Sequence, residues 1–167
     1  LANRTPGFAN SVTPVQFDLQ MASITFQPSN PVEGNDVTVF AKVKNIGTSS
    51  ADNYSIEIYN DADFDSTSDP GEIIFSQEYT NLASGDSITA NTILDSLPAG
   101  NYQIISNVLY TLDQKPENNQ LIKSFIVFPP GTNYNDVVIN EIMYAPSSGE
   151  PEWVEIYNRT ASPINLR

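Results

Sequence analysis

Alternation of apolar and polar residues with a period of two constrains this chain more than any other feature of its sequence. The clearest case lies in residues 37–44, where small apolar side chains occupy every second position: Val37, Val39, Ala41 and Val43. Successive side chains of a strand point to opposite faces, so this spacing predicts a strand with one buried and one exposed face. No segment has the three-to-four-residue spacing that indicates an amphipathic helix.

The same alternation returns along residues 17–128, and turn-rich segments interrupt it at intervals of about 8–12 residues. The alternating segments begin near Phe17, Val37, Tyr54, Ile73, Ile88, Tyr102 and Leu121. About seven short strands with such spacing are typical of two antiparallel sheets packed face to face. We therefore expect an all-β chain whose main part is an immunoglobulin-like, Greek-key β-sandwich.

One tyrosine occupies a position with a known role in such sandwiches. Tyr102 follows the turn sequence LPAG at the start of a late strand. In a tyrosine corner, the hydroxyl of a tyrosine at this point donates a hydrogen bond to backbone a few residues upstream. Tyr102 either makes this contact or is an ordinary core tyrosine.

Composition and charge exclude several functional classes. Seven basic residues against twenty acidic ones give a formal net charge of −13, which would repel nucleic acid and anionic membrane surfaces. No apolar run approaches the ~18 residues of a membrane span, so we expect no membrane insertion. The chain has no Cys and no His, which removes disulfides, thiolate nucleophiles, imidazole bases and the usual zinc sites. Cations are the ligands that such a charge favours.

The segment DADFDSTSDPGE, residues 61–72, has the most specific chemistry. Oxygen-bearing residues stand at positions 1, 3, 5, 7, 9 and 12 of this segment, which is the spacing of a calcium-binding loop. The predicted ligands are Asp61, Asp63, Asp65, Thr67, Asp69 and Glu72. Alternate carboxylates on a curling loop can converge on one calcium ion, which prefers several oxygen ligands at once.

Three features depart from the calcium-loop pattern. Ser66 stands where the pattern has glycine, Ser68 stands where it has an apolar residue, and strands rather than helices flank the segment. A solvated acidic loop that aids solubility is therefore the alternative interpretation.

Four phrases, in order, resemble the CARDB family, a bacterial domain related to cell adhesion. They are VEGNDVTVFAKVKNIGTSSADNYSIEIY, LASGDSITANTI, LPAGNYQI and DQKPENNQ. The resemblance covers about residues 17–128, and VKNIG and ENN are its most specific parts. It implies an immunoglobulin-like sandwich that serves as a repeated extracellular building block, and it names no ligand.

The two ends are similar to another family. The segment NDVVINEIMYAPSSGEPEWVEIYNRTASPINL is similar to the opening of a bacterial lamin-tail domain, and TPGFANS near the N-terminus is similar to its closing phrase. Two strands cannot bury a core alone, so we expect the C-terminal pair to need a partner. We thus expect four segments. Residues 1–16 are the tail of a preceding lamin-tail-like domain or a linker, and residues 17–128 are the sandwich. Residues 129–135 are a Pro/Gly linker, and residues 136–167 are the start of an incomplete lamin-tail-like β domain.

Together these features predict a non-enzymatic structural or adhesion module of a bacterial surface or secreted protein. We expect calcium to stabilise it, and β-strand complementation with other copies or domains of the same protein to join it into filaments. A cell-surface or polysaccharide ligand fits an adhesive role. One alternative is an accessory domain of a secreted hydrolase. Another is a carbohydrate-binding module, which predicts a row of exposed aromatics on one sheet; Phe40 and Tyr59 alone do not make such a platform.

Overall fold

The computed structural model describes residues 14–131, 135–161 and 164. The phrase TPGFANS lies outside these residues. The chain divides into two compact units, with the boundary after Phe128. No helix in the described part is long and apolar enough to cross a membrane.

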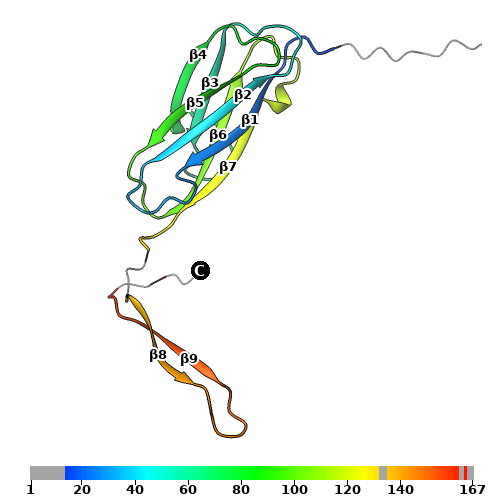
Figure 1. Cartoon of the computed structure of the whole chain (residues 1–167). Coiled ribbons are helices and arrows are strands. Elements are labelled where there is room, and N and C mark those ends of the chain that lie inside the picture. The colour runs from blue at the N-terminus through cyan, green and yellow to red at the C-terminus, as the bar shows by residue number, and fades with distance from the viewer. Residues whose placement is uncertain (1–13, 132–134, 162–163, 165–167) are drawn as a thin grey trace, which may run out of the picture. The chain divides into compact units, whose positions relative to one another are not determined.

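The first unit is a sandwich of two antiparallel sheets (Figure 1). Its strands are β1 (Leu19–Gln27), β2 (Val37–Asn45), β3 (Tyr54–Asn60), β4 (Ile73–Tyr79), β5 (Ser87–Leu94), β6 (Gly100–Leu109) and β7 (Gln120–Val127). One sheet has the order β1-β2-β5 and the other β4-β3-β6-β7. Two short 3-10 turns, η1 (Pro70–Glu72) and η2 (Pro116–Asn118), lie in the connections. This arrangement confirms the predicted all-β, immunoglobulin-like sandwich.

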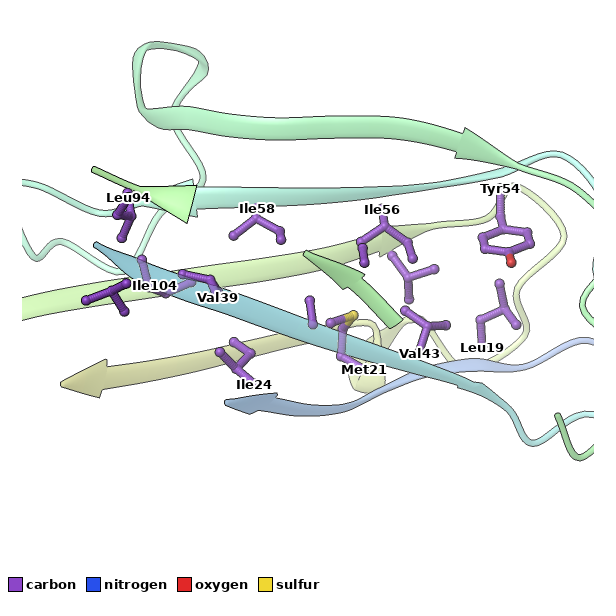
Figure 2. Packing of buried hydrophobic residues seen from close by; sticks show 14 of the residues in the cluster. Leu19, Met21, Ile24, Val39, Val43, Tyr54, Ile56, Ile58, Leu94 and Ile104 are labelled. Carbon is purple, nitrogen blue, oxygen red and sulfur yellow. The ribbon is translucent and has the colours of Figure 1, made fainter. Parts of the chain in front are cut away.

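The period-two alternation forms the core between the two sheets. Alternate apolar residues of β2 and β3 are fully or almost fully buried: Val37, Val39, Ala41, Val43, Tyr54, Ile56 and Ile58. Figure 2 shows side chains of both sheets, including Met21, Val39 and Ile56, in this shared interior. Burial of one face of each sheet is the main favourable contribution to the fold.

Tyr102 makes the tyrosine-corner contact, which is one of the two interpretations that the sequence leaves open. Its hydroxyl donates a hydrogen bond of 3.0 Å to the carbonyl oxygen of Pro98, four residues upstream. The ring also stacks on Phe125 of the neighbouring strand β7, with centroids 5.2 Å apart. Tyr102 therefore ties the β5–β6 connection to the edge of the larger sheet.

The phrase VKNIG folds into a buried polar turn after β2. The side-chain amide of Asn45 donates to the carbonyl oxygens of Ser49 and Leu82 at 2.9 and 2.8 Å. Its amide oxygen accepts a hydrogen bond of 3.0 Å from the backbone N–H of Gly47. A Cβ atom at Gly47 would lie 2.5 Å from the carbonyl oxygen of Gln16, so only glycine fits this close approach.

The second unit contains a two-stranded antiparallel hairpin of β8 (Val137–Met143) and β9 (Trp153–Asn158). The register pairs Ile139 with Ile156 and Ile142 with Val154 on one face. All four of these side chains are more than half exposed. The hairpin thus presents a continuous aliphatic face, and no residue of β8 or β9 is buried.

Candidate metal centre

The acidic segment 61–72 connects β3 to β4 and folds back over the outer face of the larger sheet. The hydroxyl of Ser66 accepts a hydrogen bond of 3.1 Å from the amide of Gln103. The hydroxyl of Ser68 accepts one of 2.8 Å from the amide of Asn107. Both amides belong to β6 and flank Ile105, which is 0% exposed although its side chain faces outward from the sandwich. The segment is therefore anchored on the sheet and covers Ile105.

Tyr59 lies beside Ile105 in the same outward-facing row, because β3 and β6 pair these two residues. It is also buried. Burial raises the pKa of the Tyr59 hydroxyl to about 12, and the hydrogen bond to Glu57 and the charge of that carboxylate act in the same direction. Phe40 belongs to β2 in the other sheet. Phe40 and Tyr59 therefore form no common aromatic platform.

Asp61 is the anchor of the acidic segment, and it is only 1% exposed. Its Oδ2 accepts hydrogen bonds from the amide of Gln103 at 2.7 Å and from the backbone N–H of Ser66 at 3.0 Å. Burial raises the pKa of the Asp61 carboxyl, but these and other hydrogen bonds outweigh it, and the pKa lies below its usual value. Oδ1 is buried and has no hydrogen-bond partner among the described residues.

Two more carboxylates gather beside Asp61. One oxygen from each of Asp61, Asp63 and Asp65 lies within 4.8 Å of the others. Oδ1 of Asp63 accepts a hydrogen bond of 3.2 Å from the backbone N–H of Asp65. Oδ1 of Asp65 accepts from the backbone N–H and the hydroxyl of Thr67, at 2.7 and 2.6 Å. Hydrogen bonds within the loop thus curl it so that alternate side chains converge.

The other predicted ligands lie outside this group of three. Glu72 reaches back to the start of the segment, where its Oε1 accepts a hydrogen bond of 2.7 Å from the backbone N–H of Ala62. Its Oε2 is buried and lacks a hydrogen-bond partner among the described residues. Thr67 is exposed and bonds to Asp65, while Asp69 is exposed and precedes η1. Glu72 is thus the additional residue that offers a free, buried oxygen.

Ser66 replaces the glycine of the calcium-loop pattern and still adopts the conformation that favours glycine. Its φ is 67°, and Phe64 has a φ of 61°. Left-handed backbone costs a non-glycine residue about 1 kcal/mol or more. The hydrogen bonds from the Ser66 N–H to Asp61 and from Gln103 to the Ser66 hydroxyl offset this cost.

Gln103 is the residue of this site that the sequence did not reveal. It lies 42 residues after Asp61, on a strand that touches the segment only in the folded chain. Its outward position on β6 marks it as a surface residue by alternation, and nothing in the spacing of the acidic residues points to it. Its amide donates to Oδ2 of Asp61, and Oδ1 is left without a hydrogen-bond partner among the described residues.

Carboxylate oxygens grouped this closely are of the kind that could hold a hard cation. No lysine or arginine neutralises the cluster: among the described residues, the ion pair joins Lys115 to Glu117, at 3.8 Å. Three carboxylates within 4.8 Å of one another repel each other unless a cation lies between them. Calcium takes six to eight oxygen ligands at about 2.3–2.6 Å in flexible geometry, so side chains of this kind suit it.

A two-sheet antiparallel sandwich with a carboxylate cluster on its β3–β4 connection defines the chain as an immunoglobulin-like domain with a candidate cation site. A family model adds the particular family. The CARDB model matches residues 16–120, and the chain therefore belongs to the CARDB family, whose domains are non-catalytic. The match ends where β7 begins, and β7 completes the core with Phe125 and Val127.

Solved structures show the same fold. One is the CARDB domain of a Pyrococcus furiosus protein, crystallised in complex with di-metal ions. Its sequence is 17% identical to this chain, and the TM-score is 0.52. The alignment covers 70% of this chain and 96% of that chain. Another is residues 272–376 of a protein named as a cell surface protein of Methanosarcina acetivorans, at 19% identity, 68% and 94% coverage and a TM-score of 0.53. Comparison with curated proteins gave no match.

Proposed function

We propose that this chain is a non-enzymatic, calcium-stabilised structural or adhesive module of an extracellular surface or secreted protein. Membership of a non-catalytic domain family supports the structural role. The name of the Methanosarcina acetivorans relative supports a place at the cell surface. The metal ions bound by the Pyrococcus furiosus domain support metal binding in a domain of this fold.

The observation that carries the calcium proposal is the buried, unpartnered Oδ1 of Asp61. A buried carboxylate oxygen without a partner is costly, and the nearby oxygens of Asp63 and Asp65 add negative charge rather than a donor. A calcium ion held by these three residues, with Glu72 as a further ligand, would satisfy all of them. Thr67 and Asp69 would complete the predicted set through backbone oxygen or water.

Thermal unfolding with and without calcium tests this proposal. Extracellular sites bind calcium at about 10⁻⁴–10⁻³ M, so 10 mM calcium should stabilise the domain by about 1.4–2.7 kcal/mol. That corresponds to a rise in Tm of about 5–10 °C, which a chelator should reverse. Asp61→Asn should abolish the rise, whereas Asp95→Asn, the same charge change at an exposed position outside the segment, should leave it intact.

Two results would overturn the proposal in different ways. If the wild-type Tm is unchanged at 10 mM calcium, the acidic segment is a solvated loop without a metal. If magnesium raises the Tm as much as calcium does, the site binds divalent cations without the preference for calcium. Magnesium demands near-octahedral geometry at shorter distances, so the calcium proposal predicts a clearly smaller effect from it.

A second proposed role, assembly with other copies, is supported by the aliphatic face of the β8–β9 hairpin. An isolated two-stranded hairpin is marginally stable in water, and pairing with β-strands of another copy would bury Ile139, Ile142, Val154 and Ile156. Sedimentation velocity should show mass that increases with protein concentration. The double variant Ile139→Thr/Ile156→Thr should remain monomeric, whereas Ile93→Thr, at an equally exposed position on β5, should still associate. A wild-type chain that stays monomeric at 0.5 mM (roughly the upper end of concentrations for a weak interface) would contradict assembly.

A further inference from the structure

A groove of about 980 Å³ lies on the larger sheet next to the area covered by the acidic segment. Outward-facing residues of β3 and β6 are among its lining, including Ser55 and Leu109, which pair across the two strands. Asn119, just before β7, and Gln120, its first residue, also line it. This volume is within the usual range for small-ligand sites, about 300–1,000 Å³.

The lining of the groove combines polar and apolar side chains, and its described residues carry almost no charge. Among the described residues, Glu78 is the one charged residue of the lining, and no lysine or arginine lines the groove. An anionic ligand would therefore meet no counter-charge here. Amide side chains can donate and accept hydrogen bonds at once, and the amide oxygen of Asn119 is buried without a hydrogen-bond partner among the described residues. Leu109, 49% exposed, adds an apolar contact surface.

The two middle strands of the larger sheet offer no free backbone edge at this groove. Strand β3 is paired on both sides, with β4 and β6, and β6 is paired with β3 and β7. The edge strands β4 and β7 also contribute lining residues, Glu78, Tyr79 and Gln120. An extended peptide that adds a strand needs such an edge, so a peptide is included in the test below. Neutral hydrogen-bonding side chains are the most numerous in the lining, and this favours a ligand that itself carries many hydrogen-bonding groups.

One wall of the groove is positioned by the acidic segment. The hydroxyl of Ser68 accepts hydrogen bonds from the amides of Asn107 and Gln120, at 2.8 and 3.4 Å. Both of these residues line the groove. Fixing their orientation in advance reduces the entropy that a ligand would lose on binding.

We propose that this groove binds a short neutral oligosaccharide. Sugar hydroxyls match the amides and hydroxyls of the lining, and the apolar face of a sugar ring matches Leu109. The proposal rests on the adhesive role proposed above, to which it gives a ligand site. None of the predicted metal ligands lines the groove, so ligand binding there can be measured separately from metal binding.

Titration of the isotope-labelled full chain with neutral hexasaccharides, followed by amide NMR shifts, tests the groove directly. The probes are the β-1,4-glucose, α-1,4-glucose, β-1,4-mannose and β-1,4-N-acetylglucosamine hexamers, each to 10 mM (about ten times a typical weak Kd). At least one probe should shift the amides of Ser55, Leu109 and Gln120. Gln120→Ala should weaken the binding of that probe about tenfold, as expected for a lost hydrogen bond. Asn91→Ala, at an exposed position on the other sheet, should leave the affinity unchanged.

Three outcomes would overturn the groove proposal. No shift with any of the four probes would do so, as would shifts that map to the other sheet or to the hairpin. Binding of a neutral serine-rich peptide without binding of any sugar would identify a peptide site instead. Calcium stabilisation is measured independently by thermal unfolding, so failure of the groove and failure of the metal centre are distinguishable.

Discussion

At the residue scale, Asn45 shows how one polar side chain can organise a turn between the sheets. Asn45 is fully buried and uses both ends of its amide, which hold backbone groups of Gly47, Ser49 and Leu82. Leu82 belongs to the connection that leads into β5, so the amide joins two loops that are far apart in sequence. The phrase VKNIG therefore encodes a specific hydrogen-bonded turn and not only the end of a strand.

Asn45→Ala should remove three hydrogen bonds to backbone groups, although the N–H of Gly47 keeps the carbonyl oxygen of Asp18 as a partner and the carbonyl oxygen of Leu82 keeps the N–H of Ala51. Each lost hydrogen bond costs about 0.5–1.5 kcal/mol, so we expect the free energy of unfolding to fall by about 2–4 kcal/mol. Urea denaturation followed by tyrosine fluorescence measures this change. Asn91→Ala, the same replacement at an exposed position of β5, should cost less than about 0.5 kcal/mol. A loss below 1 kcal/mol for Asn45→Ala would show that the turn does not depend on the amide.

The sequence allowed prediction of some individual residues and not others, for a physical reason. The convergence of Asp61, Asp63 and Asp65 follows from their alternate spacing on a curled loop, which is a local property. The role of Gln103 follows from the packing of that loop on β6, which no local pattern describes. The corner contact of Tyr102 could at least be named as one of two alternatives, because its partner, Pro98, is only four residues away.

At the scale of elements, the strands were predictable, but the path of the acidic segment was not. Alternation places each strand and assigns its faces correctly where one face meets solvent, as for Lys42 and Lys44 of β2. The same rule assigns Ile105 to the exposed face of β6. The fold-back of the segment reverses this assignment, since Ser66 and Ser68 bind residues of β6 that are 37 and 39 positions away.

Substitution of Ile105 tests whether the segment forms a second, smaller core on the outer face. Ile105→Ala should lower the free energy of unfolding by about 2–4 kcal/mol, the usual cost of truncating a buried isoleucine. Its neighbour across the strand pair, Ile122, is 38% exposed, and Ile122→Ala should cost about 1 kcal/mol or less. Equal losses in urea denaturation of the two variants would show that the segment does not shield Ile105.

At the scale of the whole molecule, the first unit contains the entire hydrophobic core of the described chain. Every buried hydrophobic residue lies between Leu19 and Val127. The strand β7 closes this core, although the family match ends at its first residue, Gln120. Backbone hydrogen bonds of 2.8 and 2.9 Å then tie Phe128 to Glu33 and Pro31, next to the loop that leads into β2. The folding unit is thus longer at its C-terminal end than the matched segment.

Two truncations separate the folding unit from the matched segment. A chain of residues 1–128 keeps the whole core and the contacts of Phe128, so its Tm should agree with that of the full chain within about 2 °C. A chain of residues 1–119 loses Phe125, Val127 and the pairing partner of β6. Removing two buried side chains and opening a strand edge should cost more than about 5 kcal/mol, comparable to the total stability of a small domain. We expect the shorter chain to be unfolded or aggregated by circular dichroism. A cooperative thermal transition in the chain of residues 1–119 would show that the sandwich does not require β7. A Tm of the chain of residues 1–128 clearly below that of the full chain would show that the hairpin unit stabilises the sandwich.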